Sequence, residues 1–285
     1  MATSRNAGGS GDDAAGRSVW MGPAPRLPAA RLVSLVPSLT DAVFRLGAGP
    51  ALVARTEYCV RPRGEVERLE TVGGTKNLDV ARILALDPDV VLANREENTR
   101  RRVERIAERV PVLLTDPRGP RDVPGLWREL GGVTGAATLA SRLAAAVESA
   151  LESPVDGAAR PTFVCWIWRD PWMAVGHRTY ISELLETVGW RNALPSHATR
   201  YPKLEPGAAL ALGPDVLLFA SEPYEFELPR DLDAFGGGFH MEDEQVWRRA
   251  DAPAALSIDG ERLSWYPSLT LEGLEYAAEL RWRVG

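Results

Sequence analysis

Two nine-residue segments of this chain are nearly identical and lie 126 residues apart. Residues 84–92 read LALDPDVVL and residues 210–218 read LALGPDVLL, so seven of the nine positions agree. Each copy has the pattern of a helix end, a proline turn and a short apolar strand. A repeat at this distance predicts two similar halves rather than a solenoid of many units. The 285 residues are enough to give each half its own core.

Short apolar runs alternate with helix-like segments along the chain. The run at 31–36 contains β-branched residues and ends at a proline, which is typical of a buried strand. Ser38 or Thr40 is expected to cap the helix that follows. Alternation of this kind predicts an α/β fold with parallel-type sheets. In the first half we expect strands at 31–36, 52–56, 90–93 and 112–114, and helices at 38–46, 77–86 and 98–110.

An alanine-rich stretch at 134–152 has the strongest helix propensity in the chain. A new strand is expected directly after it, at 162–166. We therefore expect two α/β lobes joined by one long helix. The predicted division is a disordered tail at 1–29, an N-terminal lobe at 30–133, a bridging helix at 134–157 and a C-terminal lobe at 158–285.

Composition excludes several classes of function. The net charge of −6 and the pI of about 5.3 argue against nucleic-acid binding, which needs a basic face. No apolar run approaches the roughly 20 residues of a membrane helix. The two cysteines lack zinc-like spacing. The first 29 residues contain no apolar core of a secretory signal, so the sequence predicts a cytoplasmic protein.

An acidic loop follows the predicted strand in each copy of the repeat. Glu96, Glu97 and Asn98 follow the first strand, and Glu222 and Tyr224 follow the second. In open α/β sheets, ligands bind beyond the carboxyl ends of the strands. Two such lobes would place these loops on facing walls of a cleft. The carboxylates could bind a cation or exchange protons, or they could simply favour the start of a helix that Asn98 caps.

Large aromatic residues cluster near other predicted strand ends. Trp166, Trp168 and Trp172 lie within seven residues, and Trp265 and Tyr266 form a second group. Such rings can stack on a flat macrocycle or contact a cation, and they can also fill a core. We expect ligand contacts from some of them, first of all from Trp172 and Trp265.

No metal-binding motif is present, but three separate residues could meet in space. Cys59 could bind a soft metal as a thiolate, or it could be a small buried filler. His240 follows a glycine-rich loop that could reach into the cleft, or it could be a solvated loop residue. With Glu97, these residues form a candidate metal site.

Several segments, in their order and spacing, resemble the class III substrate-binding proteins. The resemblance is strongest to the cobalamin-binding proteins of ABC importers, within the helical-backbone metal receptor superfamily. It rests on RLVSLVPSLT at 31–40, YC at 58–59, VGGTKN at 72–77, 83–92, PWMAVG at 171–176, RYP at 200–202 and SWY at 264–266.

The resemblance implies two α/β lobes bridged by a rigid helix, with the ligand between the lobes. Family ligands are cobalamin and metal chelates such as siderophores and haem. Tyr58 resembles the cleft-facing aromatic residue of the family. Taken together, the residues and the resemblance predict a ligand site formed by Pro37, Ser38, Tyr58, Cys59, Gly74, Glu96, Glu97, Trp168, Trp172, Tyr201, Glu222, Tyr224, Trp265 and Tyr266.

One departure from the family pattern concerns the permease. Importer members carry a glutamate on each lobe that docks onto permease arginines, and the matching positions here are Ala81 and Gly207, with Glu205 close to the second. This argues against docking. We expect cytoplasmic binding of a small molecule, a corrinoid or a related metal chelate, in the cleft. Two alternatives stay open, namely a metal-dependent enzyme that holds a bare metal ion in the same cleft and an importer receptor without its signal.

Overall fold

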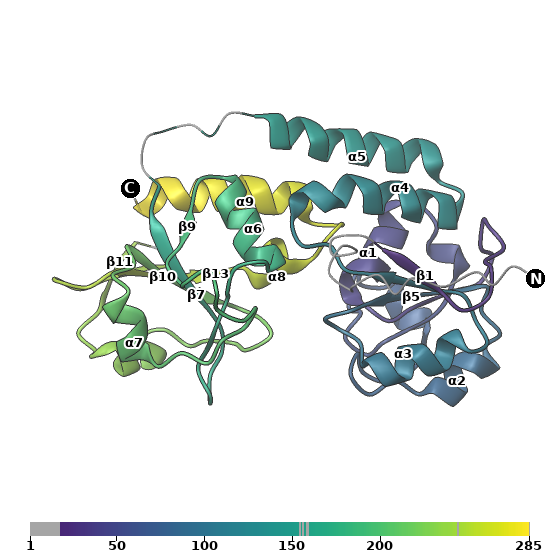
Figure 1. Cartoon of the computed structure of the whole chain (residues 1–285), viewed down its shortest axis with the longest axis horizontal. Helices are drawn as coiled ribbons and strands as arrows, with labels where there is room; N and C mark the ends of the chain where they lie inside the picture. The colour runs from purple at the N-terminus through teal and green to yellow at the C-terminus, as the bar shows by residue number, and fades with distance from the viewer. Residues whose placement is uncertain (1–17, 154, 156, 158–159, 244, 285) are drawn as a thin grey trace, which may run out of the picture.

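The computed structural model describes residues 18–153, 155, 157, 160–243 and 245–284. Two lobes lie side by side beneath a layer of helices, and each lobe is built on one β-sheet (Figure 1). This is the predicted α/β class. None of the helices in the described part of the chain has the length and apolarity needed to span a lipid bilayer.

The N-terminal sheet has the strand order β1-β6-β5-β2-β3-β4. The five strands from β6 to β4 in this order pair in parallel, and β1 pairs antiparallel with β6 at one edge. All five residues of β5 are buried, as expected for a strand covered on both faces. The strands are β1 (Val19–Met21), β2 (Leu32–Ser34), β3 (Leu52–Arg55), β4 (Glu70–Thr71), β5 (Val90–Asn94) and β6 (Val112–Thr115), with α1 (Pro37–Arg45), α2 (Val80–Ala85) and α3 (Arg100–Ala107).

The C-terminal sheet is mixed rather than purely parallel. Its order is β11-β12-β13-β10-β7-β8, and β9 also pairs with β7. The centre, β13-β10-β7, is parallel, whereas β8, β11 and β12 pair antiparallel. The elements are β7 (Thr162–Trp168), β8 (Met173–Ala174), α6 (Tyr180–Thr187), β9 (Arg191–Asn192), α7 (Pro206–Ala211), β10 (Val216–Ala220), β11 (His240–Asp243), β12 (Val246–Arg248), β13 (Ala254–Ile258), α8 (Gly260–Ser264) and α9 (Thr270–Val284).

The sequence repeat corresponds to a structural repeat. Its first copy runs from the end of α2 into β5, and its second runs from the end of α7 into β10. Asp87 and Gly213 occupy the same place in the two copies, and both have a positive φ, of 46° and 64°. Each therefore turns the chain sharply between helix and strand. The two strands end at equivalent points, which fixes where the following loops begin.

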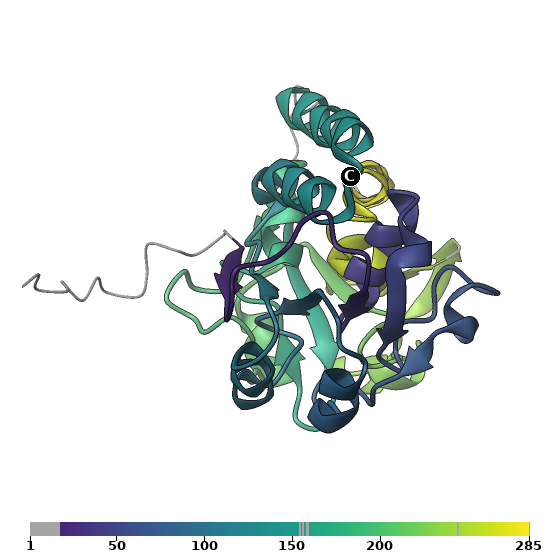
Figure 2. The same ribbon diagram turned by 90° about the vertical axis from the view of Figure 1, so that its right-hand side faces the viewer.

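Two helices lie at this place in the chain, and the sequence predicted only the second of them. α4 (Val123–Thr134) ends at Gly135, whose φ of 77° is the left-handed conformation that ends helices, and α5 (Ala137–Glu152) begins two residues later. The helix predicted from residue 134 therefore starts at Ala137. α4 and α9 lie directly above the lobes, with α5 as the outermost helix (Figures 1 and 2). A Cβ on Gly131 of α4 would come within 2.4 Å of the Ala140 Cβ of α5, so small residues permit this close packing.

Three other local expectations differ from the structure. Part of the predicted tail is ordered: β1 pairs with β6, and the Ala29 amide donates to the Val133 carbonyl. Residues 1–17 lie outside the described residues. Neither Ser38 nor Thr40 caps α1, because its N-cap is Val36 and Thr40 bonds back to the Val36 carbonyl oxygen. The helices predicted at 77–86 and 98–110 are shorter, at Val80–Ala85 and Arg100–Ala107.

Candidate functional site

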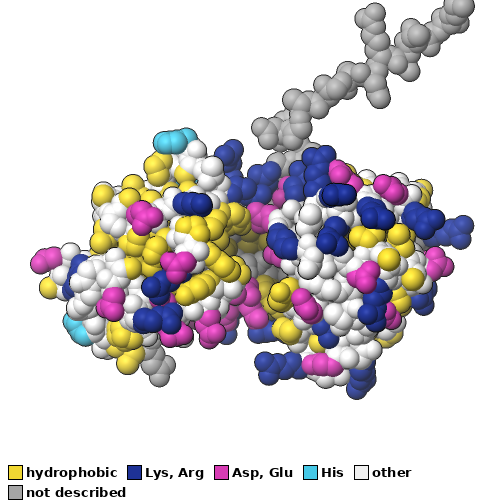
Figure 3. Space-filling view, turned by 90° about the horizontal axis from the view of Figure 1, so that it is seen from below, with side chains coloured by type: hydrophobic (Ala, Val, Ile, Leu, Met, Phe, Trp, Pro, Cys, Tyr) yellow, Lys and Arg dark blue, Asp and Glu magenta, His cyan; other side chains and the backbone are white. Residues whose placement is uncertain are grey.

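The loops that follow β5 and β10 meet where the two lobes face each other. We call this contact region the interlobe seam. The Asn94 side-chain amide of β5 donates to the Tyr266 hydroxyl at 3.1 Å, which joins the lobes directly. Seen from below, a furrow runs between the lobes, with acidic side chains along it and a broad hydrophobic surface on the C-terminal lobe beside it (Figure 3). The seam is formed by Asn94, Glu96, Glu97 and Asp116 from one lobe and by Arg200, Tyr201, Glu222, Trp265 and Tyr266 from the other.

Two asparagines set the shape of the loop after β5. The Asn94 side-chain oxygen accepts from the backbone amides of Glu96 and Glu97, at 2.9 and 3.2 Å. Asn98 accepts from the Asn94 amide and donates to the carbonyls of Leu35 and Thr75. Asn98 is thus not a helix cap, as the sequence suggested, because its side chain holds the loop against two neighbouring segments. This arrangement fixes the backbone that carries the two glutamates.

Glu96 makes the main polar contact across the seam. Its carboxylate pairs with Arg200 at 2.6 Å and accepts from the Tyr201 hydroxyl at 3.2 Å. Burial raises the pKa of Glu96, and Arg200 and Tyr201 partly offset that rise. Burial also raises the pKa of Tyr201, so its hydroxyl stays protonated as a donor.

Glu97 and Glu222 bring two further carboxylates to the seam from opposite lobes. Burial raises the pKa of both, and the negative charge of Glu97 adds to the rise at Glu222. Lys76 partly offsets the shift at Glu97. Glu222 accepts from the Ser264 hydroxyl at 2.8 Å and from the Trp265 indole nitrogen at 3.0 Å. Burial thus disfavours the charged form of both groups, and a positive or hydrogen-bond-donating ligand would stabilise that form.

Asp116 is a buried carboxylate that the sequence analysis missed. It directly follows β6, and its side chain is 2% exposed. Among the described residues, the guanidinium groups of Arg95, Arg118 and Arg200 lie within 4 Å of it, at 3.4, 3.7 and 3.8 Å. The signal that could have found Asp116 is its place at a strand end, the same signal that indicated Glu96. Arg200 entered the sequence analysis only as part of a resembling segment.

Apart from Trp172, the predicted aromatic residues are either at least partly exposed or buried at the seam. Tyr58 and Trp168 are exposed, by 58% and 40%, and the Trp168 ring lies 5.7 Å from the ring of Tyr224. Trp265 and Tyr266 are mostly buried at the seam, where Arg61 lies over the Trp265 ring. Burial raises the pKa of Tyr266 well above its usual value. Trp168 and Tyr58 lie at or just after strand ends that parallel pairing brings to the same edges as Glu222 and Glu96, whereas Trp265 and Tyr266 follow α8.

Trp172, predicted as a ligand contact, is largely buried in the structure. Its ring packs against Trp166, Phe226 and Phe235, with ring centres 5.1 to 5.8 Å apart. These residues belong to a second hydrophobic core of the C-terminal lobe. Trp172 is therefore a packing residue, because partners more than fifty positions later in the chain cover it.

The three candidate metal ligands do not come together. Cys59 is fully buried, its sulfur is hydrogen-bonded with Thr40 and Thr56, and burial raises its thiol pKa. His240 lies on the exposed edge strand β11, at the far end of the C-terminal sheet order from β7 and β8. Among the described residues, no group of three histidine, cysteine or acidic side chains could hold a metal ion. The metal site proposed from Cys59, Glu97 and His240 is therefore wrong.

The remaining predicted residues lie at the same edge of the N-terminal sheet. Pro37 and Ser38 begin α1, just after β2, whose parallel neighbour β5 leads to Glu96. A Cβ on Gly74 would meet the Glu57 carboxylate at 2.7 Å and the Tyr58 ring at 3.1 Å. A side chain at Gly74 would thus displace the exposed ring of Tyr58.

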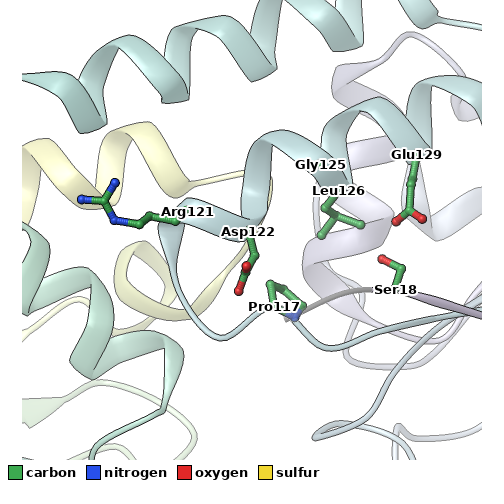
Figure 4. Close-up of a pocket in the computed structure, with 7 residues that line it drawn as sticks. All are labelled: Ser18, Pro117, Arg121, Asp122, Gly125, Leu126 and Glu129. Carbon is green, nitrogen blue, oxygen red and sulfur yellow. The ribbon is translucent and has the colours of Figure 1, made fainter. Parts of the chain in front are cut away.

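A separate cavity of about 380 Å³ lies beside the start of α4 (Figure 4). It is lined by Ser18, Pro117, Arg121, Asp122, Gly125, Leu126 and Glu129. None of the predicted site residues lines it, so it does not belong to the seam.

Comparison with known proteins identifies the family. Residues 32–253 match the model of the periplasmic binding protein family, which is more than half of the chain. The chain belongs to this family. The structure also resembles that of the periplasmic vitamin B12 binding protein of Vibrio cholerae, with a TM-score of 0.73 and 18% identity over 90% of this chain and 98% of that one. A periplasmic heme binding protein from Pseudomonas aeruginosa gives 0.71 and 19%, over 90% and 93%. The two-lobe fold of this periplasmic binding protein family member is therefore confirmed.

Sequence relatives match over a shorter stretch. The vitamin B12-binding protein of Pectobacterium carotovorum is 35% identical over 101 residues, which is 35% of this chain and 36% of that protein. The alignment thus spans about a third of the curated relative. The resemblance to substrate-binding proteins that the sequence indicated is confirmed by these matches.

Proposed function

We propose that this protein binds a metal chelate of the corrinoid or haem type at the interlobe seam. The observation that carries the proposal is that hydrogen-bonding and aromatic groups of both lobes gather there: Glu96, Tyr201, Glu222, Trp265 and Tyr266. They lie beyond the carboxyl ends of parallel strands, where α/β folds bind ligands. Family membership and relatives named for vitamin B12 and heme binding support this ligand class.

The two kinds of side chain would have different roles. The exposed rings of Tyr58 and Trp168 offer flat apolar surfaces on which a macrocycle can stack. Glu97 and Glu222 offer acceptors for donors at the edge of such a ligand. A ligand between the lobes would have to break the ion pair of Glu96 with Arg200 and its hydrogen bond with Tyr201.

Titration with cobalamin and with haemin tests the proposal. Calorimetry and absorption spectra should give saturable one-to-one binding of at least one of them. Trp168→Ala should weaken that binding about tenfold, since stacking and burial of one large ring are worth about 1–2 kcal/mol. Trp282→Ala is the matched control, because Trp282 is also exposed but lies on α9, in the helical layer above the lobe. No binding of either compound at high micromolar concentration would contradict the proposal.

We propose further that this function is cytoplasmic and independent of an importer. In support, the places expected for permease-docking acids are exposed but carry Ala81 on α2 and Gly207 on α7. Glu205, the exposed N-cap of α7, is the nearest acid to the second place. Fractionation of cells that express the full gene is the test, and recovery with periplasmic markers would contradict the proposed location.

A further inference from the structure

The contact of Glu96 with Arg200 and Tyr201 occupies the place where a ligand would separate the lobes. Glu96 belongs to the N-terminal lobe, and both of its partners belong to the C-terminal lobe. A ligand that enters between them removes the acceptor that these donors now use. Arg200 and Tyr201 are partly buried, so they then need another acceptor.

Arginine groups beside Glu96 are incompletely satisfied. The Nε atoms of Arg118 and Arg200 are buried without a hydrogen-bond partner among the described residues. Asp116 stands between the arginines, but the distances of 3.4 to 3.8 Å are those of loose ion pairs rather than of good hydrogen bonds. Oδ2 of Asp116 is also buried without a hydrogen-bond partner among the described residues. Buried polar groups in native proteins are almost always paired, so the two arginine nitrogens retain capacity to donate to a further acceptor.

The charges at this place favour a negative ligand group. Arg95, Arg118 and Arg200 now face two carboxylates, those of Asp116 and Glu96. If Glu96 is displaced, Asp116 is the one carboxylate of the described residues that stays within 4 Å of these three arginines. A neutral ligand would leave this excess of positive charge, whereas a carboxylate or phosphate would restore the present balance and could accept from Arg200 in the same way.

We propose that the ligand of the interlobe seam carries an anionic oxygen group, a carboxylate or a phosphate, and that this group replaces the Glu96 carboxylate on Arg200 and Tyr201. The inference rests on the proposed binding function and adds the chemical feature that the site selects. In it, Glu96 is a competitor of the ligand rather than one of its contacts.

Two substitutions with opposite expected effects test this role. Arg200→Gln should weaken binding of the chelate about tenfold or more, because a charged hydrogen bond is lost. Glu96→Gln should strengthen binding, by about threefold, because a neutral amide competes less well for Arg200. Arg100→Gln is the control, since Arg100 pairs with Glu104 on the exposed face of α3 and should leave affinity unchanged. Circular dichroism and melting curves check that each variant is folded.

The nature of the anionic group is tested with paired ligands. Haemin is compared with its dimethyl ester, which lacks the carboxylates, and cobalamin with cobinamide, which lacks the nucleotide phosphate. If esterification of haemin lowers its affinity for the wild type but not for Arg200→Gln, the anionic group is a carboxylate. A preference for cobalamin that disappears in Arg200→Gln identifies a phosphate.

Three results would overturn the inference. If chelates bind equally well with and without the anionic group, and equally well to Arg200→Gln, the inference fails while the proposed binding function stands. Weaker binding by Glu96→Gln would make Glu96 a ligand contact instead of a competitor. Failure of every chelate to bind would overturn the proposed function as well.

Discussion

Glu96 and Glu222 lie two residues beyond the ends of β5 and β10, at positions that the 126-residue repeat makes equivalent. Their partners are nevertheless different. Glu96 is bound by Arg200 and Tyr201 of the opposite lobe, whereas Glu222 is bound by Ser264 and Trp265 of its own lobe. One lobe therefore extends a carboxylate into its neighbour, and the other holds the equivalent carboxylate in place. The repeat supplies matching positions, and the surrounding loops give them different environments.

Stability should depend on pH through the buried carboxyl groups of the seam. Burial raises the folded-state pKa values of Glu96, Glu97 and Glu222 above the ordinary value of 4.5. Between 4.5 and the raised values the folded state holds more protons than the unfolded state. The contribution of these groups to the free energy of unfolding therefore falls as pH rises through this window.

Glu97→Gln isolates one such group. The variant should be more stable than the wild type at pH 7 and should lose this advantage at pH values below 4.5, where the wild-type carboxyl is protonated in both states. Urea unfolding at several pH values measures the difference. A stability difference that does not vary with pH would show that the charge of Glu97 is not its cause.

The close packing of α4 against α5 leaves no space for a side chain at Gly131. A Cβ at Gly131 would lie 2.4 Å from the Ala140 Cβ and 3.2 Å from the Ala137 Cα, whereas a Cβ at Gly132 would meet nothing within 4 Å. Gly131→Ala should cost about 2 kcal/mol by overpacking. Gly132→Ala should instead stabilise by about 1 kcal/mol through helix propensity. Thermal unfolding of the pair measures both, and equal shifts would contradict the packing described.

Asn98 should be essential for the loop that carries Glu96. Asn98→Ala removes hydrogen bonds to Asn94, Leu35 and Thr75 at a buried site and should cost about 2–3 kcal/mol. The control is Asn77→Ala, because Asn77 is exposed and, within the described part of the chain, its side-chain oxygen accepts from Arg102 alone. That change should cost less than about 0.5 kcal/mol. Denaturant unfolding distinguishes the two, and similar losses would argue against an anchoring role for Asn98.

Both cysteines should be unreactive in the folded protein. Burial raises the thiol pKa of Cys59, and it raises that of Cys165 to about 12. Only the thiolate attacks disulfide reagents, so labelling should be slow at pH 8 and become rapid in denaturant. Fast labelling of one thiol in the native protein would show that this cysteine is reachable from the solvent.

Local sequence patterns predicted the lobes better than the connections between elements. The strands at β2, β3, β5, β6, β7 and β10 follow from apolar runs, because most of their residues are buried. β1 is a short, mostly exposed strand that pairs with β6 and contacts the core through Met21. α4 contains three glycines and a proline, which weaken its helix propensity, and it is stabilised by packing. The antiparallel strands β8, β11 and β12 of the second sheet pair with strands that are close in the sequence, but they are short and β11 is exposed, so no buried apolar run indicates them.

The site could be predicted where strand ends determine it and not where distant residues do. Glu96 and Glu222 follow directly from the repeat, and Asp116 follows from the same strand-end rule. Trp172 looked like a ligand contact because its partners Phe226 and Phe235 lie far along the chain. His240 was placed in the wrong region for a different reason: β11 pairs with β12, the strand that follows it, and this places it at the outer edge of the sheet.

The indole of Trp265 offers an internal optical probe of the seam. Its ring nitrogen donates to Glu222, and the guanidinium of Arg61 lies over its ring. Both are charged groups in direct contact with the chromophore, so a change in either should alter its emission wavelength. The difference between the fluorescence spectra of the wild type and Trp265→Phe would isolate this signal from the other eight tryptophans. Lobe movement could thus be followed in real time without attaching a dye.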